Sequence, residues 1–154
     1  MHFVDTNVLV YGFDDSDPAK QERARLVMRR LWETRTGRIS HQVLQEFYVT
    51  VTRKLKPALS RPQARGEVED LLDWKPVHPS AALLKKAWHL EDLHGFSWWD
   101  SLIIAAALAC DSTTLLSEDL QHGLLIETLQ VVNPFHPDFQ IEQLSPKPAR
   151  KSKP

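Results

Sequence analysis

The stretch FSWWDSLIIAAALAC, residues 96 to 110, consists mostly of tryptophan, leucine, isoleucine and alanine, and Asp100 is its only charge. A helix that is apolar on every side is buried in the core of a protein. A buried carboxylate then needs a hydrogen-bond partner, a metal ion or a shifted pKa, because burying a lone charge costs free energy. The stretch therefore predicts a central helix in which Asp100 has a defined role.

Ser97 offers a structural explanation for that role. It precedes Asp100 by three residues, which is the spacing of a capping box at the start of a helix. A carboxylate in the first turn can instead point out of the N-terminal end of the helix toward a ligand. The spacing alone leaves both roles open.

Short apolar runs alternate with amphipathic segments along the rest of the chain. We expect strands at residues 2–5, 38–40, 113–116 and 129–132. We expect further helices from residue 18 to near residue 37, from residue 41 to about 55, from residue 61 to about 74, and from residue 81 to 95. Asp17, Ser40 and Ser60 precede three of these helices as N-caps. The alternation predicts an α/β fold with a parallel sheet.

The composition fits one domain without a strong charge. The 154-residue chain is 42% hydrophobic and its formal net charge is -1, so a polyanion would have to be held by a local basic patch or by metal ions. We expect a domain over residues 1–140 and a flexible, basic, proline-rich tail over residues 141–154, which offers little apolar surface to bury.

The sequence also indicates a cytoplasmic protein. The start, MHFVDTN, lacks the basic and apolar regions of a signal peptide. No apolar run approaches the ~18 residues that a membrane span needs. The single cysteine, Cys110, cannot form an internal disulfide and is expected in the core, which fits a reducing compartment.

Acidic residues from four segments are placed to converge. Asp5 and Asp119 follow predicted strands, and ligands of parallel sheets bind at the carboxyl ends of the strands. Glu46 borders the apolar face of its helix, and Asp100 lies in the first turn of the central helix. Each acid alone also has a structural reading, as a turn residue, a cap or a solvated side chain. Together they would repel one another unless a hard cation such as Mg²⁺ or Mn²⁺ neutralised them.

Other chemistries lack their residues. The seven histidines include no His-Glu-x-x-His pattern, and one cysteine cannot build a zinc cluster. The sequence also has neither a glycine-rich phosphate loop nor a Gly-x-Ser-x-Gly elbow. Zinc chemistry, P-loop nucleotide hydrolysis and serine esterase chemistry are therefore not expected.

Four motifs in order give a family resemblance. VDTNVLVY, VLQEFY, SWWDSLIIAAA, and LLSEDLQHG followed by VVNPF resemble the successive motifs of the PIN domain family, which includes the VapC toxins of toxin-antitoxin pairs. The resemblance runs from Met1 to about Phe135. It implies a three-layer α/β/α sandwich with a central parallel sheet of four to five short strands. The sequence differs mildly from the family pattern at Trp98 and at Glu118, which is an extra acid beside Asp119.

The resemblance also implies a site and an activity. Asp5, Glu46, Asp100 and Asp119 would bind Mg²⁺ or Mn²⁺ and act in the hydrolysis of RNA, and Asn7 and Ser117 would be supporting polar groups. The substrate would be single-stranded or looped RNA. The densest basic stretch of the folded part could follow its phosphates; its residues are Arg53, Lys54, Lys56, Arg61 and Arg65. A solvated helix end and loop is the competing explanation of that stretch.

Partners and alternatives follow from the same resemblance. We expect a toxin restrained by a cognate antitoxin, whose basic or hydrophobic segment would occupy the acidic cleft and a neighbouring apolar groove. The amphipathic helices would permit a homodimer, and no membrane partner is expected. The alternatives are a non-catalytic module that binds nucleic acid or protein, and a housekeeping nuclease without an antitoxin.

Overall fold

A five-stranded sheet forms the centre of the fold. The structure is a computed structural model that describes residues 1–144. The sheet has the order β2-β1-β3-β5-β4. Its strands are β1 (His2–Val4), β2 (Gly37–Arg38), β3 (Thr114–Leu116), β4 (Leu125–Ile126) and β5 (Leu129–Val132). All neighbours are parallel except β4, which pairs with β5 antiparallel, so the predicted α/β fold with a mainly parallel sheet is confirmed.

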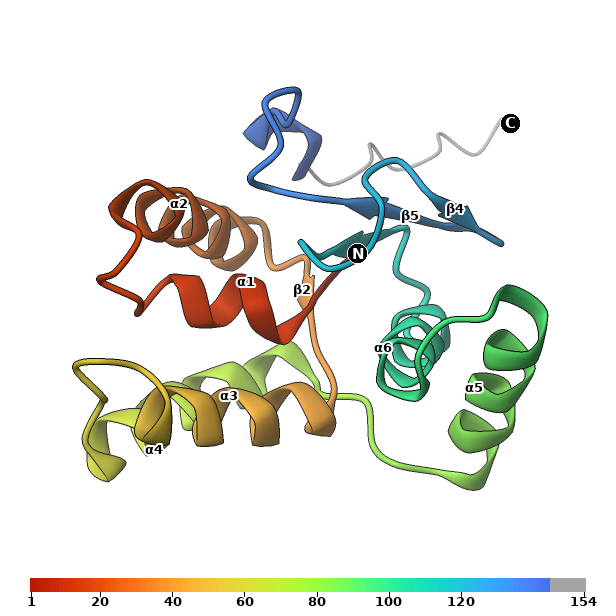
Figure 1. Cartoon of the computed structure of the whole chain (residues 1–154), viewed down its shortest axis with the longest axis horizontal. Helices are drawn as coiled ribbons and strands as arrows, with labels where there is room; N and C mark the ends of the chain where they lie inside the picture. The colour runs from red at the N-terminus through yellow and green to blue at the C-terminus, as the bar shows by residue number, and fades with distance from the viewer. Residues whose placement is uncertain (145–154) are drawn as a thin grey trace, which may run out of the picture.

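Helices cover the sheet on both sides. They are α1 (Thr6–Tyr11), α2 (Pro18–Thr34), α3 (His41–Arg53), α4 (Arg61–Leu71), α5 (Ala81–His94) and α6 (Trp98–Ala109), with the short 3-10 helices η1 (Leu72–Trp74) and η2 (Ile141–Leu144). In Figure 1, α1 and α2 lie on one side of β2, whereas α5 and α6 lie on the other. None of the helices in residues 1–144 combines the length and the apolar composition that crossing a lipid bilayer requires.

The local signals for the helix starts act as predicted. The side chains of Asp17, Ser40 and Ser60 each accept a backbone N–H of the first turn of the following helix. Gly95 ends α5 with a φ of 70°, a left-handed conformation that glycine adopts without steric strain. The apolar stretch of residues 96 to 110 forms α6, whose residues from Ile103 to Ala107 are buried. The predicted central helix is therefore present.

Three features differ from the sequence-based expectation. Asp5 follows β1 as the N-cap of α1, a helix that was not predicted because its residues, TNVLVY, have the polar start of a turn and the branched side chains of a strand. The two-residue strand β4 was too short to predict. The predicted strand at 38–40 begins one residue earlier, and Ser40 makes an isolated bridge with Val77.

The end of the described chain packs against α2. Ile141–Leu144 forms η2, and the side chain of Leu144 is buried at 1% exposure. These residues fall within the predicted tail, and its remaining residues, 145–154, lie outside the described part of the chain.

Gly37 offers a test of the packing between β2 and η1. A Cβ at this position would lie 2.6 Å from Cδ2 of Trp74, whose side chain is buried. We expect Gly37→Ala to lower the free energy of unfolding by about 1–3 kcal/mol through overpacking, measured by urea denaturation. Gly66→Ala is the control, because a Cβ there meets no atom within 4 Å and lies in α4, where alanine should add about 0.5–1 kcal/mol. Equal effects of the two substitutions would contradict the packing role.

Candidate active site

Asp5 lies where β1 ends and α1 begins. Its side chain is 7% exposed and its Oδ1 accepts the backbone N–H of Thr6 at 2.7 Å. Its Oδ2 accepts the Ser117 hydroxyl at 2.8 Å and the Asn7 side-chain amide at 3.1 Å. Because β1 and β3 are parallel neighbours, the residues that follow both strands meet at one edge of the sheet. Asp5 is thus held by groups from both strand ends.

Asn7 connects Asp5 with Asp119. Its side-chain amide donates to Oδ2 of Asp119 at 2.9 Å, and its carbonyl oxygen accepts the backbone N–H of Glu118 at 3.3 Å. The Ser117 hydroxyl oxygen accepts the backbone N–H of Asp119 at 3.2 Å. The predicted supporting groups Asn7 and Ser117 therefore position both carboxylates.

Glu46 approaches the same edge from α3. The Thr6 hydroxyl donates to its Oε2 at 2.7 Å, and the Gln42 amide donates to its Oε1 at 2.9 Å. Thr6 is the residue whose N–H binds Asp5, so one residue connects two of the predicted acids. Asp5, Glu46 and Asp119 are brought together by the structure.

The electrostatics of this group are unfavourable in the absence of a cation. The pKa of Asp5 is raised from its ordinary 3.8 to about 6, chiefly by burial, and the nearby charges of Asp119 and Glu46 act in the same direction. The hydrogen bonds from Ser117 and Thr6 act in the opposite direction but do not outweigh burial. A bound cation would favour the ionised form of all three carboxylates.

Asp100 occupies the first turn of α6 and bonds with Ser97. Ser97 accepts the N–H of Asp100 at 3.1 Å, and its hydroxyl donates to Oδ2 of Asp100 at 2.7 Å. Ser97 therefore caps α6, but the capping box is incomplete. A full capping box would also have the Asp100 carboxylate accept the Ser97 N–H, and no such hydrogen bond is present in residues 1–144. The neighbouring Trp99 lines one cavity together with Thr6 and Glu46. The start of α6 therefore faces the side of the site formed by Glu46.

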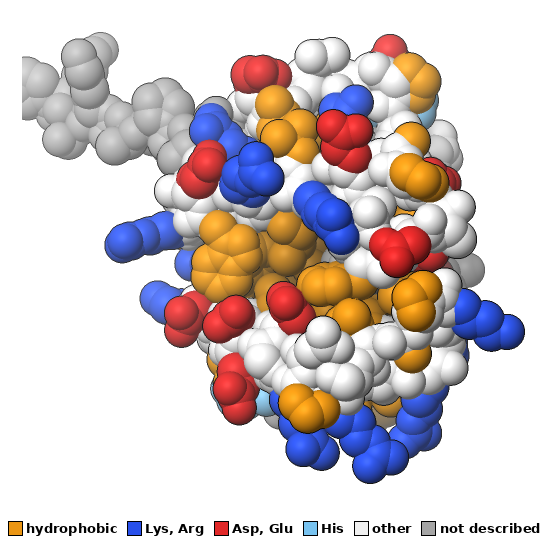
Figure 2. All heavy atoms as spheres, turned by 90° about the vertical axis from the view of Figure 1, so that its left-hand side faces the viewer, with side chains coloured by type: hydrophobic (Ala, Val, Ile, Leu, Met, Phe, Trp, Pro, Cys, Tyr) orange, Lys and Arg blue, Asp and Glu red, His pale blue; other side chains and the backbone are white. Residues whose placement is uncertain are grey.

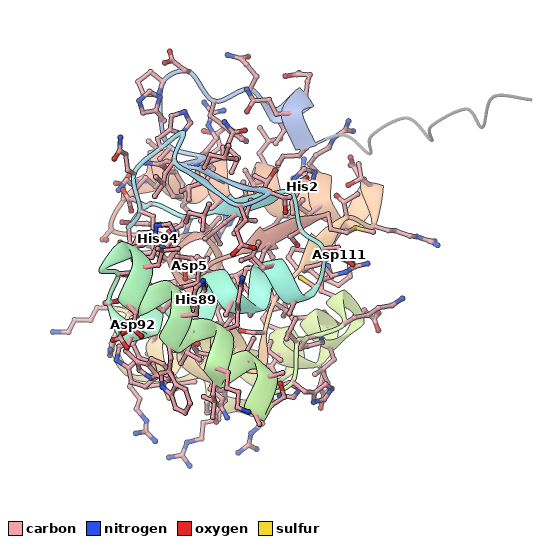
Figure 3. The ribbon with its side chains drawn as sticks, turned by 90° about the vertical axis from the view of Figure 1, so that its right-hand side faces the viewer. His2, Asp5, His89, Asp92, His94 and Asp111 are labelled. Atoms are coloured by element: carbon pink, nitrogen blue, oxygen red, sulfur yellow. The ribbon has the colours of Figure 1, made fainter. Side chains whose placement is uncertain are left out.

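The donor set has the chemistry that a hard divalent cation prefers. Within residues 1–144, no group of three or more His, Cys, Asp or Glu side chains forms a ready metal cage. The acids lie instead in a network with Thr6, Asn7 and Ser117, in which every side-chain group that could face a cation is a carboxylate, hydroxyl or amide. Oxygen ligands of this kind fit Mg²⁺ or Mn²⁺. Figure 3 shows His89, Asp92 and His94 along α5. They are separate in the fold from Asp5, which lies between β1 and α1.

A lysine that the sequence analysis did not single out neutralises the extra acid at 118. Lys20, in the first turn of α2, forms an ion pair with Glu118 and donates to the Tyr11 hydroxyl at 3.1 Å. The hydrogen bond with Glu118 raises the pKa of Lys20. This pair occupies Glu118 and fixes the loop that carries Asp119. It joins residues 98 positions apart, so no local spacing indicates it.

Two of the predicted basic residues border different cavities. Arg53, Lys54, Lys56, Arg61 and Arg65 are all exposed, around the connection from α3 to α4. Lys54 lines the cavity that contains Glu46, whereas Arg65 lines another cavity with His41 and Tyr48. Lys54 is therefore the member of this set that borders the acidic site.

A separate apolar cavity lies between α1, α2 and α4. It has a volume of about 300 Å³, and its apolar wall includes Leu9, Phe13, Met28, Trp32, Phe47 and Leu71. Figure 2 shows this face, with hydrophobic side chains at the base of a hollow, acidic side chains along its lower edge, and lysine or arginine side chains above it. Three acids line the cavity: Glu67, Asp70 and Asp73. Burial raises the pKa of Glu67, and the Asp70 charge raises it further.

The fold and the site define an α/β protein with an acidic, all-oxygen pocket at the carboxyl edge of its sheet. The family model for the PIN domain matches residues 2–123. The chain therefore belongs to the PIN domain family, whose members are generally nucleases that depend on divalent metal ions. A search of curated protein sequences finds no match to this chain.

Two solved structures share the fold. One is VapC20 of Mycobacterium tuberculosis, described as a toxin that cleaves the sarcin-ricin loop, with a TM-score of 0.55, 20% identity, and coverage of 75% of this chain and 87% of that chain. The other is VapBC2 of Rickettsia felis bound to a DNA fragment from its promoter, with a TM-score of 0.53, 18% identity, and coverage of 84% and 96%. The family resemblance seen in the motifs is thus confirmed, and these structures confirm the fold.

Replacing Asp5 tests the electrostatic strain of the site. Without divalent ions, ionised Asp5 favours the unfolded chain, because its pKa is about 6 in the fold against an ordinary 3.8. Asparagine keeps an oxygen that can cap α1 and carries no charge, while its amide no longer accepts from Ser117 and Asn7, which offsets part of the gain. We expect Asp5→Asn to raise the free energy of unfolding at pH 7.5 by about 1–3 kcal/mol in EDTA, measured by urea denaturation.

The sign of the pH dependence provides the control. The unfolded chain loses the Asp5 proton first, so the stability of the wild type falls relative to the variant as the pH rises from about 4 to about 6. The difference in free energy of unfolding between Asp5→Asn and the wild type should be smallest near pH 4 and constant above pH 7. An advantage that does not change with pH would exclude the Asp5 charge as its cause.

Proposed function

We propose that this chain is a divalent-metal-dependent endoribonuclease that hydrolyses phosphodiester bonds in single-stranded or looped RNA. The observation that carries the proposal is the network around Asp5, in which a buried carboxylate of raised pKa is coupled to Asp119 and Glu46. Membership of the PIN family supports the nuclease class. The metal, the RNA substrate and the cytoplasmic location belong to the proposal.

Asp5 and Asp100 would be the principal metal ligands, and Glu46 and Asp119 would complete the set. A divalent ion at such a site supplies an activated water and stabilises the negative charge that develops during phosphodiester hydrolysis. The chain itself positions the acids: Ser117 and Asn7 hold Asp5, Asn7 holds Asp119, and Thr6 holds Glu46. Lys20 keeps Glu118 paired outside this set.

The non-catalytic alternative has less support. A module that only binds RNA gains nothing from concentrated carboxylates, since they repel the phosphates. The burial of Asp5 next to two other acids also costs stability, which is typical of a functional site. A housekeeping nuclease without an antitoxin would have the same site and differs only in its partner.

The antitoxin is the proposed partner. One of the similar structures is a toxin-antitoxin complex, and this chain has an apolar cavity with an acidic rim between α2 and α4. A segment with an apolar stripe flanked by lysine or arginine would match that cavity in shape and charge. Exposed apolar residues of α5, such as Leu84 and Leu93, are the proposed basis for a homodimer.

Cleavage of a mixed single-stranded RNA pool tests the activity. We expect the wild type to cut in Mn²⁺ or Mg²⁺ and to stop in excess EDTA. Asp5→Asn and Asp100→Asn should each lower the rate by about 100-fold or more, the effect of removing one preorganised charged group from an active site. Asp92→Asn on the outer helix α5 should cut at the wild-type rate.

Ser97→Ala separates the two roles of Asp100. It removes the cap of α6 and the hydroxyl that donates to Oδ2 of Asp100, at a cost of about 1 kcal/mol of stability, but keeps the carboxylate itself. It should therefore retain cleavage. If Asp100→Asn cuts like the wild type, Asp100 serves only the helix end. If the folded wild type cuts no RNA with either metal, the proposed activity is wrong.

If a small protein is encoded beside this chain's gene, that protein tests the proposed partner, and the absence of such a gene would favour the housekeeping nuclease. The small protein should suppress cleavage by the wild type and by Trp88→Glu, which changes an exposed residue of α5. It should not suppress Trp32→Glu, because this substitution places a charge in the apolar cavity among acids. Equal suppression of both variants would contradict the cavity as the binding site, and no suppression of the wild type would favour the housekeeping nuclease.

A further inference from the structure

A cavity of about 540 Å³ extends from the acidic site along α3 to the start of α6. Thr6 and Glu46 form its side next to the site, and Trp99 and Lys54 also line it. The rest of its wall includes the side chains of Gln42 and Gln45. The cavity therefore joins Glu46, one of the predicted acids, to an aromatic ring, a cation, two amides and the apolar side chain of Val49.

Trp99 differs from the tryptophan beside it. Trp98 stacks on Trp88 with ring centroids 6.5 Å apart, whereas Trp99 has no ring partner in residues 1–144 and is 63% exposed. It directly precedes Asp100, so its indole is fixed to the first turn of α6. A single exposed ring is common on protein surfaces, so the feature that distinguishes Trp99 is its position in a cavity that also contains Glu46 and Lys54.

Lys54 supplies the positive charge. It follows the last residue of α3 and forms no ion pair with any described residue. Glu46 lies eight residues earlier on the same helix, which places the two positions about 12 Å apart along the helix axis. A phosphate bound by Lys54 would thus lie a short stretch of RNA backbone away from the acids.

We propose that this cavity is a nucleotide-binding subsite, in which an unpaired base stacks on the indole of Trp99, the ammonium of Lys54 binds a flanking phosphate, and Gln45 hydrogen-bonds to the base edge. The inference rests on the proposed ribonuclease function and names where its substrate is held. Aromatic rings and lysines bind single-stranded RNA in this way with little dependence on sequence.

The charged and hydrogen-bonding groups of this cavity favour RNA over a protein segment. The indole lies beside glutamine, threonine, lysine and glutamate side chains here, but it also lines an adjoining apolar groove with Leu83, Leu84 and Leu102, where a protein segment would dock. A protein partner on Trp99 is therefore the competing outcome of the test.

The experiment measures binding of a fluorescent single-stranded RNA in EDTA, where cleavage is absent. We expect Trp99→Ala to weaken binding by about 10-fold, because loss of one base-aromatic stack has an effect of this order, and Trp99→Phe to keep most of the affinity. Trp88→Ala, on α5, is the matched control and should bind like the wild type. Lys54→Gln should lower the slope of log affinity against log salt by about 0.7.

The cleavage kinetics in Mn²⁺ give a second readout. Trp99→Ala should raise KM by a similar factor with kcat little changed, because the ring binds the RNA outside the reacting atoms. With an RNA in which the stacked base is replaced by an abasic position, the wild type and Trp99→Ala should have the same KM.

The outcomes separate the two proposals. If the wild type cuts RNA and Trp99→Ala binds as tightly as Trp88→Ala, the subsite is wrong and the ribonuclease stands. If Trp99→Ala weakens binding but the wild type never cuts, the subsite stands and the activity is wrong. If Trp99→Ala changes the sedimentation of the free protein with unchanged RNA affinity, the ring belongs to a protein interface and the subsite is wrong. A wild type that neither binds nor cuts RNA overturns both.

Discussion

The hydrogen bonds of the Asp5 carboxylate join the parts of this fold that form the site. One oxygen begins α1 by accepting the N–H of Thr6, and the other accepts Ser117 from the end of β3 and Asn7 from α1. These bonds connect the first strand, the first helix and the third strand at one point. The position has an electrostatic cost, since burial and two neighbouring acids raise the pKa of Asp5 to about 6. The fold thus keeps Asp5 buried, although its ionised carboxylate would be more stable in water.

Small polar residues separate the acids while holding them near one another. Asn7 donates to Asp5 and Asp119, and Thr6 donates its hydroxyl to Glu46. Each donor binds a carboxylate oxygen through a hydrogen, whereas a bound cation would neutralise the carboxylate with its charge. A site arranged in this way can exist without metal and still present oxygen ligands, because these donors hold the carboxylates in position.

Sequence patterns predicted the parts of the structure that depend on nearby residues. The caps at Asp17, Ser40 and Ser60 act over three residues, and the all-apolar composition of α6 requires its burial. The placement of Asp5 and Asp119 at one edge followed from the rule for parallel strands.

Features that depend on distant residues could not be read in this way. The Lys20–Glu118 pair and the cavity beside Trp99 arise only when α2, α3 and α6 are packed around the sheet. Helix α1 was missed because its six residues are shorter than the span over which helical periodicity can be recognised.

Two cavities of the described residues differ in the charges and hydrogen-bonding groups on their walls, and this separates the contacts that they can make. The cavity between α1, α2 and α4 has apolar walls with an acidic rim, so it repels phosphates and suits an apolar segment with basic flanks. The cavity beside Glu46 has amides, hydroxyls and Lys54 around one exposed indole, so it suits a nucleotide. Both cavities contact α3, through Phe47 in the first and Glu46 in the second. Because these two residues are adjacent in α3, one turn of this helix contributes to both walls, and the neighbouring elements give each cavity its character: α1, α2 and α4 for the first, and the start of α6 for the second.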